Sequence, residues 1–152
     1  IIRYPDKSEL ITELLELAQE ELTHFQMVHE RILARGLELG KPRKDEYVRQ
    51  LMEYFPQGGK REDRLVNDLL ISAMIEARSC ERFKVLSENI EDKELATFYH
   101  DLMISEANHY TLFLNYARKY GGREITDKKW NDLLVFEADI MSKLGNEEKI
   151  HG

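Results

Sequence analysis

Apolar residues recur at intervals of three and four along most of the chain, which is typical of amphipathic helices and not of strands. The first stripe follows a helix start at Asp6, where Asp6 as N-cap and Glu9 three residues later form a variant of the capping box. The stripe ends before Gly36 and Gly40, so we expect one long helix between these signals. Its apolar or small members are Leu14, Ala18, Phe25, Val28 and Ile32.

Three further stripes predict helices at about residues 62–87, 93–120 and 127–144. Residues 37–60 are rich in proline and glycine around a short helical pattern near 45–54, and we interpret them as a long crossover connection. No repeat or interdomain linker interrupts the chain. We therefore expect four long helices in a single all-α domain that spans residues 1–152.

Composition narrows the class of protein further. The longest apolar stretch, Leu69–Ile75, is far shorter than the roughly 20 residues of a membrane span, so we expect no membrane association. The single cysteine, Cys80, excludes an internal disulfide and any four-cysteine metal centre, and it is typical of a cytoplasmic protein. The net charge of −7 argues against indiscriminate nucleic-acid binding.

Three of the apolar stripes contain a glutamate where a core residue is expected, namely Glu21, Glu76 and Glu106. A buried carboxylate is costly unless a cation or hydrogen-bond donors meet it. Two of these acids belong to Glu-x-x-His motifs, which place the imidazoles of His24 and His109 on the same helical faces. The five side chains therefore form a candidate metal site.

Carboxylate and imidazole ligands without thiolate suit iron or manganese. A ferritin-like bundle takes one Glu from each of two helices and a Glu-x-x-His motif from each of the other two. The order of motifs here matches the second, third and fourth helices of such a bundle. The sequence thus predicts a ferritin-like four-helix bundle whose first helix is absent from this chain, which makes the domain N-terminally incomplete, plus an extra C-terminal helix.

Two alternatives remain open at this point. The fourth carboxylate could come from the absent first helix or from Glu137, which lies on the stripe of the last helix. If the last helix lies outside the bundle, it could instead bury Glu137 against an arginine. The inward acids could instead form buried ion pairs with Arg78 or Arg82, although such pairs explain neither histidine. A third Glu-x-x-His spacing, Glu148 and His151, lies in a charged tail without a stripe, and we expect no metal there.

The local sequences around the acids are more specific than their spacing. The segments Ile75–Phe83, Ser105–Tyr110 and Glu20–His24 together resemble the bacterial tRNA hydroxylases that act on methylthio-isopentenyl-adenosine, and Phe98–His100 extends the resemblance. It implies a non-haem di-iron monooxygenase that hydroxylates the isopentenyl side chain of a modified adenosine next to the tRNA anticodon.

The cofactors follow from this resemblance. Two iron ions would be held by Glu21, His24, Glu76, Glu106 and His109. Dioxygen would be the co-substrate, and an external electron donor, a reductase or a ferredoxin, would be needed because one cysteine cannot build a redox centre. The alternative function is a ferritin-like iron-binding, ferroxidase or storage protein, which would use the same ligands.

An acidic protein that binds tRNA needs a local basic surface. The basic residues cluster in the crossover, at the start of the helix that follows it, and at the start of the last helix. We expect tRNA contacts from the first two clusters, in particular from Arg43, Lys44, Arg61 and Arg64. The third cluster is Lys128 and Lys129.

Overall fold

The computed structural model describes residues 2–42, 44–56 and 58–144 of the chain. These residues form five helices, and no strand occurs among them, as the sequence predicted. The helices are α1 (Ser8–Ala34), α2 (Glu46–Met52), α3 (Arg61–Asn89), α4 (Lys93–Gly121) and α5 (Arg123–Leu144). The chain divides into two compact units, residues 1–43 with α1 (unit 1) and residues 44–152 with the other four helices (unit 2).

Unit 1 differs from the sequence prediction at the start of α1. The N-cap is Lys7, and no side chain caps the helix, so the prediction that Asp6 caps it is wrong. A carboxylate oxygen of Asp6 lies instead 3.5 Å from the ammonium group of Lys7. Phe25, which we expected in the apolar stripe, is 54% exposed, whereas Glu21 and His24 lie on a less exposed face.

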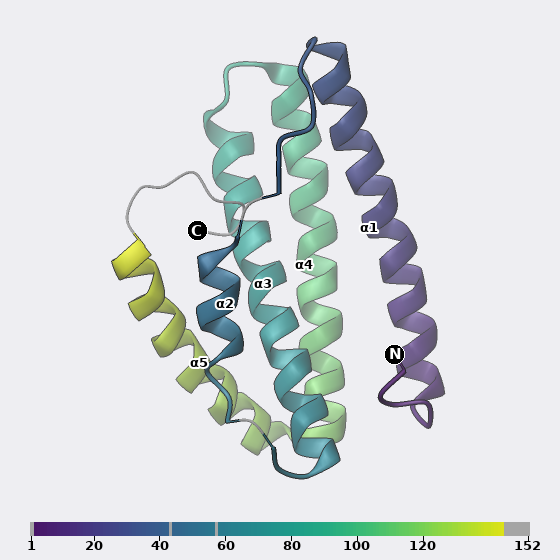
Figure 1. Ribbon diagram of the computed structural model, residues 1–152, viewed down its shortest axis with the longest axis vertical. Coiled ribbons are helices and arrows are strands. Elements are labelled where there is room, and N and C mark those ends of the chain that lie inside the picture. The colour runs from purple at the N-terminus through teal and green to yellow at the C-terminus, as the bar shows by residue number, and fades with distance from the viewer. Residues whose placement is uncertain (1, 43, 57, 145–152) are drawn as a thin grey trace. The chain divides into compact units, whose positions relative to one another are not determined.

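Unit 2 is built on the antiparallel pair of α3 and α4, which lie side by side along their lengths (Figure 1). The helices are joined by a turn at Ile90–Asp92. The turn is fixed by Asp92, whose side chain accepts hydrogen bonds from the backbone N–H groups of Glu94 and Leu95 at the start of α4. This N-cap satisfies two of the amides that a helix start leaves without a partner.

A sharp corner connects α4 to α5. Gly122 adopts φ of 77°, a conformation that favours glycine, and so reverses the chain within one residue. Gly121 packs tightly, since a Cβ atom there would lie 2.7 Å from the Thr126 hydroxyl and 3.0 Å from a Val66 methyl group. The last helix begins at Arg123, directly after Gly122, and residues 123–126 form its first turn. The predicted start of this helix at Asp127 is wrong.

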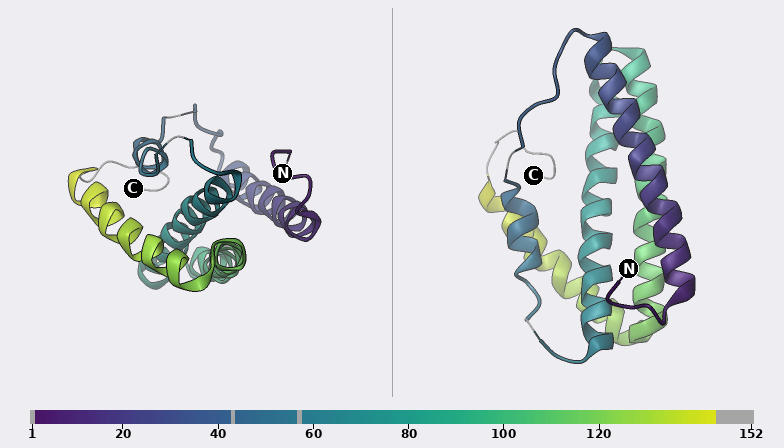
Figure 2. Two further views of the ribbon diagram at one scale, coloured as in Figure 1. Left: turned by 90° about the horizontal axis from the view of Figure 1, so that it is seen from below. Right: turned by 45° about the vertical axis from the view of Figure 1, so that its right-hand side comes forward.

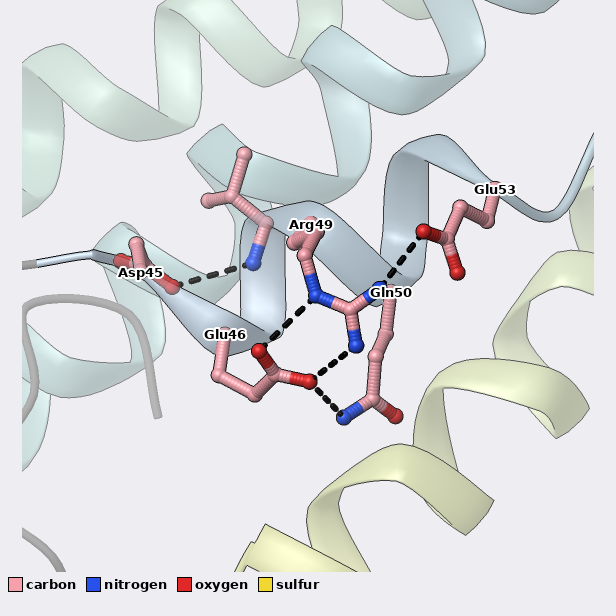
Figure 3. Close-up of polar contacts among 6 residues, drawn as sticks. Asp45, Glu46, Arg49, Gln50 and Glu53 are labelled. Atoms are coloured by element: carbon pink, nitrogen blue, oxygen red, sulfur yellow. Dashed lines mark hydrogen bonds and ion pairs between the residues drawn. The ribbon is translucent and has the colours of Figure 1, made fainter.

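The short helix α2 packs against α5 and α3, and Figure 2 shows it beside α5 in two further views. The Asp45 side chain caps α2 by accepting a hydrogen bond from the Val48 N–H, and Arg49 bonds both Glu46 and Glu53 on the outer face (Figure 3). Its inner face carries a tyrosine, Tyr47, that is 0% exposed. The crossover segment is thus anchored to the rest of unit 2 by α2.

The core of unit 2 is apolar and is supplied by all four of its helices. Its members include Tyr47, Leu51, Leu65, Leu69, Leu70, Ala73, Phe98, Leu102, Phe113, Leu114, Trp130, Leu133 and Ile140. None of the helices in the described part of the chain has the length and apolar composition that a membrane span requires.

Candidate metal centre

Three of the predicted ligands meet within unit 2. Glu76 on α3 and Glu106 and His109 on α4 each offer a ligand atom, and these atoms lie within 4.8 Å of one another. Glu106 is 6% exposed and His109 is 4% exposed. The two α4 residues are three positions apart, so they project from one face of the helix toward the helix that carries Glu76.

The chemistry of this trio suits a metal ion. Two carboxylates brought close together in a buried place repel each other, and a cation between them removes that repulsion. Carboxylate oxygen and imidazole nitrogen are ligands that iron and manganese accept. The trio therefore fits one half of the di-iron site that the sequence predicted.

The other predicted ligands belong to unit 1. Within α1, Nδ1 of His24 lies 3.4 Å from a carboxylate oxygen of Glu21, and its Nε2 lies 3.8 Å from a carboxylate oxygen of Glu20. The i, i+3 spacing therefore places imidazole and carboxylate together, as expected of a Glu-x-x-His motif. The site with all five ligands remains a prediction.

Glu137 has a different partner. Its side chain is 5% exposed and accepts hydrogen bonds from the Arg78 guanidinium, one of them 2.9 Å long from Nε. The Tyr47 hydroxyl donates to the same carboxylate over 3.4 Å. Arg78 also contacts Glu81 at 2.5 Å. The buried ion pair that we considered for the inward acids thus exists, but its acid is Glu137.

The electrostatics of this network follow from burial. Burial raises the pKa of Tyr47 well above its ordinary value, and the charge of Glu137 raises it further. Burial lowers the pKa of Arg78, but the hydrogen bonds and charge of Glu137, together with the charges of Glu81 and Tyr47, outweigh that effect. The pKa of Arg78 is therefore raised. Tyr47 could not be identified from the sequence, because this residue lies in a connection without long periodicity.

Cys80 lies one helical turn after Glu76 and is half-buried. Burial raises the pKa of its thiol, and the nearby charge of Glu106 adds to that effect. The thiol of Cys80 is therefore protonated at neutral pH in the metal-free protein.

Three of the four residues predicted for tRNA contact belong to unit 2, where they lie in two places. Arg61 and Arg64 lie in the first turn of α3, whereas Lys44 directly precedes the N-cap of α2. Arg43 lies outside the described residues, as do Glu148 and His151 of the tail.

Comparisons with known proteins identify relatives of the chain. The family model described as tRNA-(MS2IO6A)-hydroxylase (MiaE) matches residues 1–152. The tRNA 2-(methylsulfanyl)-N(6)-isopentenyladenosine(37) hydroxylase of Pseudomonas putida is 38% identical over 99% of this chain and 72% of its own length. The protein of the same name from Salmonella typhimurium is 35% identical over 94% of this chain and 52% of its own length.

A solved structure is also similar. Protein 43 with aldehyde deformylating oxygenase activity, from Synechococcus, matches with a TM-score of 0.79 and 31% identity, over 91% of this chain and 67% of its own. The predicted fold class, all-α and ferritin-like, is confirmed by this match together with the helical structure.

Proposed function

Because the chain belongs to the MiaE family of tRNA hydroxylases, we propose that it hydroxylates the isopentenyl side chain of a 2-methylthio-N6-isopentenyladenosine next to the tRNA anticodon. The family and the enzyme class predicted from the sequence are confirmed by the family match. The observation that carries the proposal is the buried convergence of Glu76, Glu106 and His109. A cytoplasmic location, where tRNA is available, is part of the same proposal.

In this proposal two iron ions are held by Glu21 and His24 from unit 1 together with the trio from unit 2. The support is the repetition of the Glu-x-x-His motif on α1 and α4 with a further glutamate on α3, the pattern of carboxylate-bridged metal pairs in helical bundles. Since the ligands come from both units, residues 1–152 would act as one domain. Glu137 is left out of the ligand set because Arg78 binds it.

The bound iron pair would supply the activation of dioxygen that attack on a C–H bond of the isopentenyl side chain requires. One oxygen atom enters the substrate as a hydroxyl group and the other leaves as water, which consumes two electrons and two protons. The single cysteine cannot form an iron–sulfur cluster or an internal disulfide that would deliver these electrons to the iron pair. We therefore include an external donor, a reductase or a ferredoxin, in the proposal.

In this reaction the protein itself would hold the metals and would keep water away from them. The glutamates balance the positive charge of the metals, and the histidines complete the ligand set as neutral nitrogen donors. Buried apolar residues two helical turns away, Leu69 on α3 and Phe113 on α4, exclude water from the seam between the helices on that side. A dry surrounding strengthens the electrostatic interactions of the ligands.

The decisive experiment supplies purified protein with Fe(II), a chemical reductant and ¹⁸O₂, and offers tRNA that carries the methylthio-isopentenyl-adenosine. We expect mass spectrometry of the digested nucleosides to show one labelled oxygen in the isopentenyl side chain. Uptake of many iron atoms per chain without labelled product would favour the ferroxidase or storage alternative. Two bound irons without product from either tRNA or free nucleoside would refute the hydroxylase proposal.

A further inference from the structure

Three helix ends meet at one end of unit 2, where α3 begins, α4 ends and α5 begins (Figure 1). Gly121 of α4 packs against Val66 of α3. The Lys129 ammonium group of α5 donates a hydrogen bond of 2.8 Å to the Asn67 side chain of α3. These contacts make the three ends one continuous surface, which we call the basic end.

The basic end concentrates positive charge on an acidic protein. Residues 60–64 and 118–129 contain eight basic and four acidic residues, while the whole chain has a net charge of −7. The N-termini of α3 and α5 add the positive ends of two helix dipoles, against one negative C-terminus from α4. The basic members are Lys60, Arg61, Arg64, Arg118, Lys119, Arg123, Lys128 and Lys129. Arg118 is partly neutralised by Asp127, at 2.7 Å.

The opposite end of the helix pair has the reverse charge. Residues 86–97, which include the turn between α3 and α4, contain four acidic residues and one basic residue, Lys93. A polyanion is therefore attracted to one end of the α3–α4 pair and repelled from the other. The difference in charge between the two ends favours binding of RNA at the basic end.

Glu76, Glu106 and His109, which we call the metal cluster because they could hold a metal ion, lie within reach of a polyanion bound at the basic end. Glu76 is 15 residues from Arg61 along α3, and Glu106 is 15 residues from Gly121 along α4. At about 1.5 Å per residue both separations are about 22 Å. A nucleic-acid strand with about 3.4 Å between phosphates covers that length with on the order of six phosphates. An RNA hairpin is large enough to contact the basic end while one unstacked base lies at the cluster.

We propose that the basic end holds the phosphate backbone of the tRNA while the modified base reaches the metal cluster. The proposal rests on the proposed function, because that function supplies the RNA substrate. It joins Arg61 and Arg64 of the predicted contacts to Lys119 and Lys128, whereas Lys44, which directly precedes the N-cap of α2, is not part of this surface. Phosphate contacts of this kind position an RNA without reading its sequence.

The test compares two triple variants with the same change in net charge. Arg64→Glu, Lys119→Glu and Lys128→Glu reverse exposed charges at the basic end, and Lys84→Glu, Lys93→Glu and Lys143→Glu reverse exposed charges elsewhere in unit 2. Affinity for tRNA is measured across a salt series. We expect the first triple to weaken binding about tenfold or more at low salt and to lower the slope of log K against log salt by about two, because each lost phosphate contact removes 0.7 to 0.9 from it. The second triple changes the slope by less than about one.

A second measurement separates this proposal from the proposed function. The first triple should oxidise the free modified nucleoside at the wild-type rate, since that substrate has no tRNA backbone to bind. Equal weakening of tRNA binding by both triples, or an unchanged salt slope in the first, would overturn the basic-end proposal. A wild-type protein that binds tRNA with the expected salt slope but hydroxylates neither substrate would overturn the proposed function and leave the basic end as an RNA-binding surface.

Discussion

Two buried carboxylates of unit 2 have nearly the same exposure, 5% for Glu137 and 6% for Glu106, and both lie on helical stripes where an apolar residue is expected. Their partners differ. Glu137 is bound by the Arg78 guanidinium and the Tyr47 hydroxyl, both supplied by the protein. Glu106 is grouped with the acid Glu76 and the imidazole of His109.

The comparison indicates what would separate a structural acid from a candidate metal ligand. An acid that meets a guanidinium is neutralised within the chain, and it needs nothing further to be stable in the interior. An acid that meets a second acid and an imidazole is stabilised by a bound cation. Burial alone does not distinguish the two, whereas the groups gathered around each carboxylate differ.

The largest expected effect follows from removing a ligand. We expect Glu76→Ala to abolish binding of the iron pair and to lower hydroxylation by about 10³-fold or more, since the metals supply the chemistry. The apo protein should keep its melting temperature, because the change also removes repulsion between two acids. Iron content and calorimetry test this, with Glu88→Ala on the same helix as the exposed control. A variant whose apo form melts at a lower temperature and whose iron-loaded form keeps the wild-type iron content would contradict the assignment.

The second effect concerns the ion pair of Glu137. Replacing Arg78 by Met leaves that buried carboxylate without its cation, and we expect a loss of about 3 kcal/mol in the free energy of unfolding. The estimate is at the low end for buried pairs because the Arg78 side chain is 22% exposed. Iron content should stay at the wild-type value. Urea unfolding of the apo and iron-loaded proteins measures both quantities, and a loss of iron would show that this network also shapes the metal site.

A third variant sharpens the same comparison. When Arg78→Met is combined with Glu137→Leu, both charges are removed, and we expect at least half of the lost stability to return. The double-mutant cycle isolates the coupling between the two side chains. An additive result would mean that they contribute independently.

The smallest expected effect belongs to Tyr47. The change Tyr47→Phe removes one long hydrogen bond to Glu137 but keeps the ring, so we expect about 1 kcal/mol of destabilisation. Thermal unfolding of the apo protein, with Tyr54→Phe as a less buried control, measures it. A cost above that of Arg78→Met would make the tyrosine the main partner of the carboxylate.

Much of the fold was predictable from the sequence, since the stripes of α3 and α4 follow the helical period over seven turns or more. The convergence of Glu76, Glu106 and His109 was predictable for the same reason, because Glu106 and His109 interrupt a regular stripe. The N-cap of α1 was not predictable, because no side chain caps this helix and the Asp6 carboxylate contacts the Lys7 ammonium group. The start of α5 was not predictable either, because Gly122 turns the chain and α5 begins at Arg123, before the predicted start at Asp127. The partner of Glu137 was open as well, because Tyr47 and Glu137 are 90 residues apart.

The turn at Ile90–Asp92 also has a consequence for how the protein folds. This turn joins the two helices that carry Glu76, Glu106 and His109, so pairing of the helices can start at the turn, with contacts that are local in sequence, and then extend to these residues. Local contacts cost little loop-closure entropy and form early. We therefore expect the helical hairpin to be structured in the folding transition state, so that Glu76, Glu106 and His109 come together without needing a bound metal ion.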